Sequence, residues 1–345
     1  MFTLWDPEKH FPAPDKIPLL SGTEYRRVHT AVEGEYQFLL GAAVIRHEGI
    51  LRACWGNSFR GENDDNTILF EKCSADGGMT WDEGRRISRT DAGFGRSHGV
   101  YAALGGELYA FCPRARYERI DAYPELVCEG YRLHPEGNWE FLGTVLPDRF
   151  WPMCEPIRLE NGNLLMAGLE TDRAEAAVAL CREDDVTRWE MKRFENPEGF
   201  RYWGETTVLR RSDRLTAIIR GGNRILCSES TDEGESWSSL EQSNFPISAS
   251  KMYAGTLQNG LNYLIFNAET AVYREALCIA IGDSYFRRVF LLRRGFDAPP
   301  RFWGQNEWCY PYAWEDREAG LLYVIYAKNK EDCELAILPT TQLTL

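Results

Sequence analysis

The chain repeats one simple unit six times: an apolar strand, a turn containing Gly or Asp, and a second apolar strand. The six units are Gly41–Trp55, His98–Cys112, Cys154–Leu169, Glu205–Arg220, Met252–Asn267 and Tyr312–Ala327. Their turns lie 47 to 60 residues apart, at Gly49, Gly105-Gly106, Asn161-Gly162, Ser212-Asp213, Asn259-Gly260 and Ala319-Gly320. An all-strand repeat of about fifty residues is typical of propeller blades. The sequence therefore predicts an all-β, six-bladed β-propeller in which each unit supplies the two inner strands of a blade.

A second repeat lies between these units. Ser74-Ala75-Asp76-Gly77-Gly78-Met79-Thr80-Trp81 and Ser230-Thr231-Asp232-Glu233-Gly234-Glu235-Ser236-Trp237 share the pattern Ser-x-Asp-x-Gly-x-Thr/Ser-Trp, and Arg182–Trp189 is a degenerate third copy. Asp bonds nearby backbone amides, Gly accepts a positive φ, and the Trp buries a large ring at the start of the next strand. The pattern resembles the Asp-box, or BNR repeat, of the sialidase superfamily. That resemblance implies a sialidase-like propeller with the boxes on outer hairpins, away from the active site.

No sustained helical periodicity and no linker divides the chain, so we expect residues 1–345 to form a single propeller domain. We expect residues 1–30 to wrap around that domain or to close the ring. The Pro-rich stretch Phe11-Pro12-Ala13-Pro14 fits the wrapping part. A strand from the Tyr25–Thr30 region, or from the extreme N-terminus, would close the ring against the last blade and remove an exposed edge.

Composition and net charge limit the classes of binding partner that we expect for this chain. A formal net charge of −13 argues against nucleic acid or an anionic membrane, and no apolar run approaches membrane-spanning length. Met1–Leu20 lacks an apolar signal core, so a cytoplasmic location is expected. The ten cysteines occur singly, several within apolar runs, which favours buried free thiols. Without clustered His, Cys and Asp spacing, we expect no metal and no cofactor.

Chemistry is expected at the end of the propeller where the first strands of the six units begin and the second strands finish. The first strands contribute Arg96, His98, Glu155, Glu205, Lys251, Tyr253, Tyr310 and Tyr312. The second strands contribute Arg60, Arg114, Arg116, Glu170, Asp172, Arg220, Asn267 and Lys328. Trp55, Trp151 and Trp203 accompany them. Aromatic rings beside charged groups suit a carbohydrate, whose apolar faces stack and whose hydroxyls need hydrogen bonds.

Four segments resemble the active-site segments of retaining sialidases. They are Trp203–Leu209 followed by Arg220, Asn267 with Arg274 to Leu277, Tyr310-Pro311-Tyr312-Ala313, and Arg60 with Asp65. The resemblance implies Tyr310 as nucleophile, Glu205 as its base and Asp65 as acid/base. It implies Arg60, Arg220 and Arg274 as ligands of the substrate carboxylate. His98, Glu155, Lys251 and Trp203 are further expected substrate contacts.

The implied roles form a coherent set. A carboxylate on the anomeric carbon would repel an anionic nucleophile, whereas a tyrosine hydroxyl is neutral until a neighbouring Glu takes its proton for the attack. An Asp of raised pKa protonates the leaving oxygen, and arginines bind the carboxylate bidentately. The predicted function is hydrolysis of a terminal, acidic sugar from an oligosaccharide or glycoconjugate.

One segment departs from the family. Sialidases open their first blade with Arg-Ile-Pro, whereas Tyr36-Gln37-Phe38-Leu39-Leu40-Gly41-Ala42 contains no arginine. The departure favours an acidic sugar related to sialic acid, or a different exo-glycosidic bond. Two alternatives remain open. One is a polysaccharide lyase or atypical glycosidase in which His98 and a tyrosine transfer protons. The other is a non-catalytic propeller that binds glycan or protein.

Overall fold

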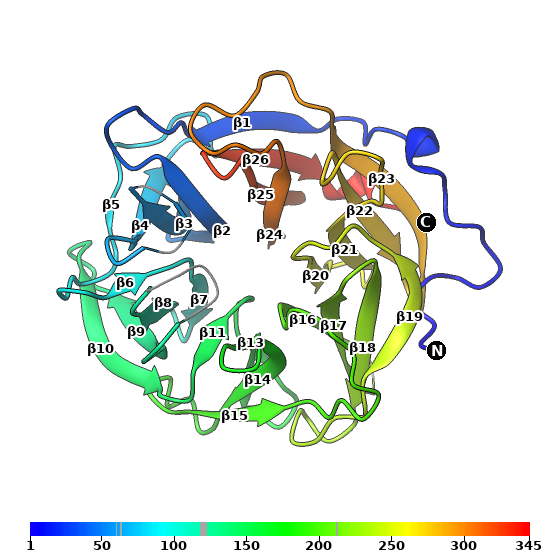
Figure 1. The fold of residues 1–345 in the computed structure, drawn as a ribbon, viewed down its shortest axis with the longest axis horizontal. Helices are drawn as coiled ribbons and strands as arrows, with labels where there is room; N and C mark the ends of the chain where they lie inside the picture. Colours follow the sequence, from blue (N-terminus) through cyan, green and yellow to red (C-terminus); the bar gives the residue numbers. More distant parts are fainter. Residues whose placement is uncertain (60, 63, 118–122, 212) are drawn as a thin grey trace.

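The computed structural model describes residues 1–59, 61–62, 64–117, 123–211 and 213–345. Within these residues the strands form six antiparallel sheets arranged in a ring (Figure 1). Secondary structure outside the strands is limited to the 3-10 turns η1 (Pro14–Lys16) and η2 (Thr340–Gln342) in this part of the chain. The predicted all-β, six-bladed propeller is confirmed.

Each sheet is one blade, and the strands of each blade are named in order from the ring axis outward. Blade 1 is β2 (Phe38–His47), β3 (Ile50–Ser58), β4 (Ile68–Ser74) and β5 (Arg85–Arg86). In blade 2, β6 (Gly95–Arg96) and β7 (Val100–Leu104) pair with β8 (Glu107–Ala115), followed by β9 (Val127–Leu133) and β10 (Trp139–Leu146). In blade 3, β11 (Phe150–Pro152) and β12 (Ile157–Arg158) pair with β13 (Leu164–Glu170), followed by β14 (Glu175–Cys181) and β15 (Trp189–Arg193).

The other three blades follow the same order. Blade 4 is β16 (Thr206–Arg210), β17 (Leu215–Gly221), β18 (Arg224–Ser230) and β19 (Glu241–Pro246). Blade 5 is β20 (Tyr253–Thr256), β21 (Asn262–Asn267), β22 (Ala276–Gly282) and β23 (Phe286–Arg294). Blade 6 is β24 (Trp308–Asp316), β25 (Leu321–Lys328), β26 (Asp332–Pro339) and β1 (Glu24–His29). The inner two strands of each blade are the hairpins that the sequence repeat predicts, although Ser212, in the fourth turn, lies outside the described residues.

The N-terminal segment supplies the outermost strand of the last blade. β1 pairs with β26, from Glu24 opposite Ile337 to His29 opposite Cys333. Before β1, the chain runs along the outside of blades 4 and 5 (Figure 1). Backbone bridges join Phe2 to β19, and Trp5 and Leu19 to β23. The first and last parts of the sequence therefore hold one blade together, and β26 has no free edge.

His29, at the end of β1, makes this closure sensitive to acid. Its ring stacks on Trp55 of blade 1 at 5.1 Å, and its Nε2 is buried without a partner among the described residues. Burial, with the charges of Lys72 and Arg301, lowers the pKa of His29 to about 4. Below about pH 6.5, His29 is protonated in the unfolded chain but stays neutral in the folded chain. The free energy of unfolding therefore falls as the pH drops towards 4.

We expect His29→Phe, which keeps a ring on Trp55, to remove part of that acid sensitivity. The loss of unfolding free energy between pH 6.5 and pH 5 should be about 1.5 kcal/mol smaller in the variant than in the parent protein. Urea titrations at the two pH values measure it. His10→Phe, at an exposed histidine, is the control and should leave the loss unchanged.

The Asp-boxes lie between the third and fourth strands of blades 1 and 4. In the second box, Ser230 Oγ donates to Asp232 Oδ1 at 2.8 Å, and the amide of Ser236 donates to the same oxygen at 2.9 Å. Trp237 Nε1 donates to the carbonyl of Gly234 at 3.1 Å. Burial raises the pKa of Asp232, but hydrogen bonds from Ser236 and Ser230 outweigh it and hold that pKa below its usual value. The first box repeats these contacts, and the degenerate copy keeps a Trp189 Nε1 bond to Val186 at 2.8 Å.

Gly234 in the second box also packs against the neighbouring blade. Its φ is +83°, and a Cβ there would lie 2.6 Å from Leu165 Cδ1 of blade 3. We expect Gly234→Ala to lower the free energy of unfolding by about 2 kcal/mol, from left-handed strain plus this overlap. Gly162→Ala is the matched control, because φ is +89° there but no atom lies within 4 Å of the added Cβ. Equal losses in chemical denaturation would show that the contact between blades contributes nothing.

Three kinds of structural feature bear on function: membrane-spanning helices, metal sites and disulfides. No helix of the described chain is long and apolar enough to cross a membrane. No group of three or more His, Cys, Asp or Glu side chains with the geometry of a metal site occurs in the described ranges. All ten cysteines are free, nine of them buried and Cys73 half-buried.

Candidate functional site

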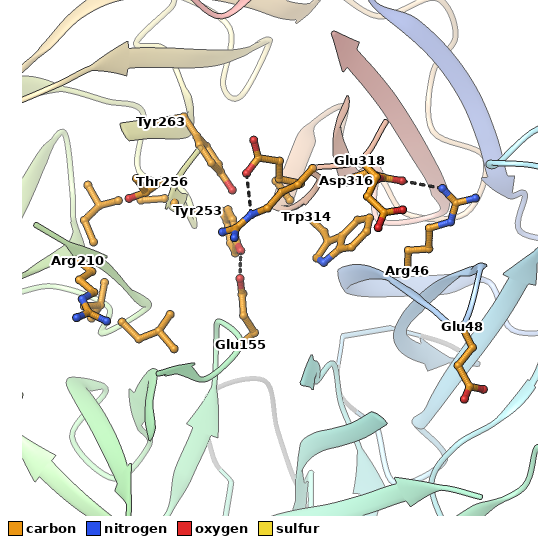
Figure 2. Close-up of a pocket in the computed structure, with 18 of the residues that line it drawn as sticks. Arg46, Glu48, Glu155, Arg210, Tyr253, Thr256, Tyr263, Trp314, Asp316 and Glu318 are labelled. Atoms are coloured by element: carbon orange, nitrogen blue, oxygen red, sulfur yellow. Dashed lines mark hydrogen bonds and ion pairs between the residues drawn. The ribbon is translucent and has the colours of Figure 1, made fainter. Parts of the chain in front are cut away.

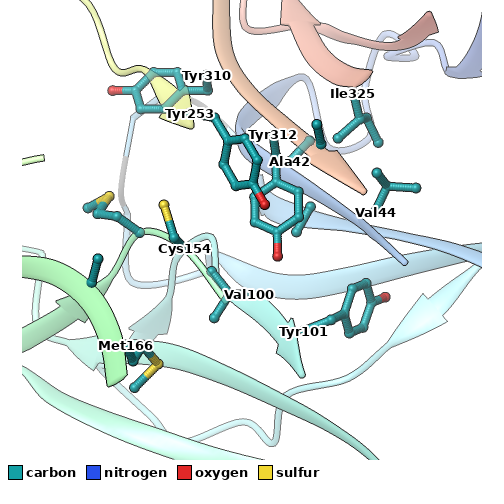
Figure 3. Packing of buried hydrophobic residues seen from close by; sticks show 14 of the residues in the cluster. Ala42, Val44, Val100, Tyr101, Cys154, Met166, Tyr253, Tyr310, Tyr312 and Ile325 are labelled. Carbon is teal, nitrogen blue, oxygen red and sulfur yellow. The ribbon is translucent and has the colours of Figure 1, made fainter. Parts of the chain in front are cut away.

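Tyr310 is the centre of a polar cluster at the end of the ring where the inner strands begin. Its backbone has φ +53°, and the pairing of β24 with β25 shifts register between Cys309 and Tyr312. A left-handed conformation costs a residue with a Cβ roughly 1–2 kcal/mol, and such strain concentrates at functional sites. The resulting bulge separates the ring of Tyr310 from that of Tyr312, as Figure 3 shows.

The surroundings of the Tyr310 hydroxyl are charged. Burial, followed by the nearby carboxylates of Glu62 and Glu205, raises the pKa of Tyr310 well above its ordinary value, whereas Arg274 and Arg220 lower it. No hydrogen bond of this hydroxyl occurs in the described part of the chain. Burial and the two carboxylates favour the neutral phenol, so it loses its proton only to a base in direct reach.

Glu205 and Arg220 form an ion pair beside Tyr310. Glu205 directly precedes β16 and is 3% exposed, and Arg220 near the end of β17 reaches its Oε2 through Nη1 at 2.9 Å. The backbone holds the pair in register, because the amide of Arg220 donates to the carbonyl of Glu205 at 3.1 Å. Oε2 is committed to Arg220, while Oε1 forms no hydrogen bond with any described residue.

A second buried pair joins blades 5 and 6. Arg274 Nη1 lies 2.7 Å from Glu307, and both side chains are almost fully buried. Arg274 Nη2 also donates to the carbonyl of Ala249 at 3.1 Å. Lys330, in the turn between β25 and β26, lies 3.6 Å from Glu307 and 2.7 Å from Glu62. The ammonium of Lys330 is 5.8 Å from the centre of the Tyr310 ring, so it adds a third cation to the cluster.

His98 packs against Tyr310. Its ring lies 5.6 Å from the Tyr310 ring and 5.0 Å from Trp151. Both ring nitrogens are buried and have no partner among the described residues. Burial and the charge of Lys251 lower the pKa of His98 well below its ordinary value, so the ring is neutral at pH 7. Gly41 makes room for it, since a Cβ at Gly41 would lie 2.3 Å from the imidazole.

The structure brings together only part of the predicted site. Arg60 lies outside the described residues. Asp65 is exposed, and its Oδ1 accepts a hydrogen bond from the amide of Tyr117 at 2.9 Å, with no contact to Tyr310 or Glu205 shown. Trp203 is half-buried against the core, and its carbonyl accepts from the amide of Glu205 at 2.8 Å. The roles of these residues stay predictions.

Two further predicted residues lie deeper along the ring axis. Lys251 donates to the carbonyl of Pro311 at 3.3 Å and faces His98. Glu155, between β11 and β12, accepts a hydrogen bond from the hydroxyl of Tyr253. Glu155 is also part of the lining of a pocket at the opposite end of the ring, so the structure does not place it beside Tyr310.

Sequence reasoning missed three members of the cluster: Glu62, Glu307 and Lys330. Glu62 belongs to the same polar loop as Asp65, and Glu307 lies three residues before Tyr310. Lys330 follows the second strand of the last unit by only a few residues, which was the available signal for it. The charged side chain of each is largely buried. Burying a charge lowers the stability of the fold unless an opposite charge lies close.

Comparison with known families identifies the fold group. A model of the BNR repeat-like domain matches residues 138–324, more than half of the chain. The chain belongs to the BNR repeat-like family. A search of curated proteins by sequence found no match to this BNR repeat-like protein.

Solved structures show the same propeller. A protein of unknown function from Dyadobacter fermentans aligns with a TM-score of 0.69 at 17% identity, covering 92% of this chain and 99% of its own. Trypanosoma rangeli sialidase in complex with sialic acid aligns with a TM-score of 0.64 at 16% identity, covering 95% of this chain. The Hadza microbial sialidase Hz136 gives 0.67 at 13% identity, covering 89%. The BNR repeat-like chain spans about 60% of the trypanosomal sialidase and 66% of Hz136. These likenesses show a sialidase-like fold.

Proposed function

We propose that this BNR repeat-like propeller is an exo-glycoside hydrolase that removes a terminal, anionic sugar, with Tyr310 as its nucleophile. The observation that carries the proposal is the setting of Tyr310, whose strained backbone holds a buried phenol among Glu205, Arg220 and Arg274. Arg220, Arg274 and Lys330 are each paired with a carboxylate. Arg220, however, engages Glu205 through Nη1, and its other N–H groups have no partner among the described residues and can bind an anion. The alignment with a sialidase in complex with sialic acid supports a sugar as that anion.

The reaction would begin with proton transfer from Tyr310 to Glu205. Glu205 Oε1 is available for the proton, because Arg220 engages only Oε2. The phenolate oxygen then bonds to the anomeric carbon as the bond from that carbon to the leaving oxygen breaks, and an acid protonates the leaving oxygen. Water reverses these steps: it attacks the anomeric carbon and gives a proton to the conjugate base of that acid, the bond to Tyr310 breaks, and Glu205 returns the proton to the phenolate.

The acid that protonates the leaving group would come from the loop after β3. Asp65 is the residue that the sequence predicts, but Glu62 is the carboxylate of this loop that acts on Tyr310. Arg220 and Arg274, with Arg60 as the sequence predicts, would bind the carboxylate of the sugar. The positive charge of these arginines offsets the negative charge of the substrate carboxylate, which would otherwise repel an anionic nucleophile.

His98 supports a second candidate, a lyase that acts on a uronic acid polymer. A neutral imidazole with two unpaired nitrogens, packed on Tyr310, is equipped to take a proton. In β-elimination the base removes the proton beside the carboxylate, a C=C bond forms, and the glycosidic oxygen leaves with a proton from Tyr310. The cations of the cluster would stabilise the carboxylate while its neighbouring carbon loses the proton.

One experiment separates these functions. The purified full chain is incubated with fluorogenic glycosides of sialic acid, glucuronic acid and galactose, and separately with uronic acid polysaccharides under ultraviolet detection. Release of an anionic sugar supports the hydrolase, and an absorbing unsaturated product supports the lyase. Turnover of the neutral galactoside alone contradicts both. Silence across the panel, with binding in calorimetry, assigns a glycan-binding role.

A further inference from the structure

A second pocket opens at the opposite end of the ring, where the inner hairpins turn. We call it the hairpin-end pocket; its volume is about 890 Å³, within the range of small-molecule sites. Its walls come from the far ends of β2, β16, β20 and β24, and Figure 2 shows the lining side chains. The Tyr310 cluster lies at the start of those strands, so the proposed chemistry does not use this pocket.

The floor of the pocket is aromatic and accepts hydrogen bonds. Glu155 Oε1 accepts from the hydroxyl of Tyr253, whose ring packs on Tyr312 at 4.6 Å. Glu155 Oε2 is buried and forms no hydrogen bond of normal length with a described residue, although the hydroxyl of Tyr312 acts on the same carboxyl, so Oε2 can still accept a hydrogen bond from water or a ligand. Tyr263 lies beside Tyr253, and Gly255 makes room for it, because a Cβ at Gly255 would lie 2.5 Å from the Tyr263 hydroxyl.

The walls carry more negative than positive charge. Each arginine of the lining already has a carboxylate partner: Arg46 with Asp316 at 2.7 Å, Arg210 with Glu160 at 2.8 Å, and Arg317 with Glu315 at 3.5 Å. Three lining carboxylates, those of Glu48, Glu155 and Glu318, have no ion pair in the described residues. The lining is therefore rich in hydrogen-bond acceptors, and an incoming anion would meet uncompensated negative charge.

An organic cation fits less well than a neutral ligand. Burial raises the pKa of Glu155 and outweighs the hydrogen bonds from Tyr253 and Tyr312 and the charge of Lys251, which lower it. An ammonium group at Glu155 would be repelled by Lys251, which acts on the same carboxyl. Hydroxyl groups satisfy acceptors without adding charge, and Trp314, half-buried in the wall, offers an aromatic surface.

We propose that the hairpin-end pocket binds a neutral saccharide, whose apolar face stacks on Trp314 and whose hydroxyls donate to Glu155 and bond to Tyr263. The site is separate from the Tyr310 cluster and does not depend on the function proposed for it. Both mouths of the propeller would then carry sugar, an anionic one at the strand-start end and a neutral one at the hairpin end.

Binding to the full-length chain tests the proposal. Ligand-observed NMR and calorimetry are run with glucose, galactose, mannose, maltose, cellobiose and lactose, and with choline and glucuronate as charged probes. We expect at least one neutral sugar to bind, with a Kd about tenfold or more higher in Trp314→Ala and a few-fold higher in Tyr263→Phe. Tyr263→Phe removes only a hydroxyl, so it reports on the site even if Trp314→Ala misfolds.

The controls place the binding on one end of the ring. Phe141→Ala, at an exposed aromatic residue of β10, should leave the affinity unchanged, and so should Tyr310→Phe. Loss of neutral-sugar binding in Tyr310→Phe with retention in Tyr263→Phe would move the sugar to the other end and overturn the proposal. Binding of choline or glucuronate alone, or of no probe at tens of millimolar, would overturn it as well.

Discussion

Tyr310→Phe is expected to abolish turnover of the anionic glycoside that the substrate panel identifies, lowering kcat by on the order of 10³-fold or more. The variant removes only the oxygen that would bond to the anomeric carbon. The ring still fits between His98 and Lys330. Since the hydroxyl has no hydrogen bond to a described residue, the melting temperature should change little. Initial rates and thermal denaturation of the same preparation measure both effects.

Two companion variants make that result specific. Glu205→Gln should lose a similar share of activity, because an amide cannot take the phenolic proton. Tyr109→Phe, at a buried tyrosine of β8 far along the sequence from the cluster, should keep full activity. Retained activity in Tyr310→Phe would remove the nucleophile from the proposal. Because the lyase candidate also takes its leaving-group proton from Tyr310, that result would remove Tyr310 from both candidate mechanisms.

The fold could be predicted from the sequence because two independent patterns agree. The repeat of strand, turn and strand sets the number of blades, and the Asp-boxes mark where the third strand of a blade passes to the fourth. Both are local signals, since the Gly and Asp residues that make the turns lie within a few positions of one another. These local patterns could not predict contacts between blades, such as that of Gly234 with Leu165, because those residues lie far apart in the chain.

The candidate site was predictable in its location more than in its contacts. Topology brings Glu205, Arg220 and Tyr310 to one end of the ring, and the order of the strands suffices for that. The left-handed conformation of Tyr310 is set by a bulge against β25 that no local pattern reveals. Lys330 and Glu62 come together across 268 positions of sequence, so their pairing depends on ring closure.

Glu155 shows a second limit of predicting site residues from the order of the strands. It is the second residue of a repeat unit, near the start as Glu205 is, and so was expected in the same site. The inner edge of blade 3 is split into β11 and β12, and Glu155 lies in the gap between these two short strands. That interruption places it midway along the axis, where Tyr253 binds it and the hairpin-end pocket reaches it.

Arg274→Met is expected to lower the free energy of unfolding by on the order of 3 kcal/mol or more, because it leaves Glu307 buried without its closest cation. Lys330 at 3.6 Å compensates only in part. Replacing both members of the pair, as Arg274→Met with Glu307→Leu, should recover most of that loss, since an apolar pair of similar volume carries no desolvation penalty. Urea denaturation of the two single variants and the double variant gives the coupling energy.

The same three variants separate structure from substrate binding. If Arg274 binds the anion of the substrate, the double variant will be stable and yet still show a raised KM for the anionic glycoside. If Arg274 only balances Glu307, activity will return together with stability. Arg158→Met, at an exposed ion pair with Asp184, should change the unfolding free energy by about 1 kcal/mol or less and leave KM unchanged. A buried cation that is costly to hold and also needed for affinity would explain why the chain keeps an ion pair where an apolar pair would be equally stable.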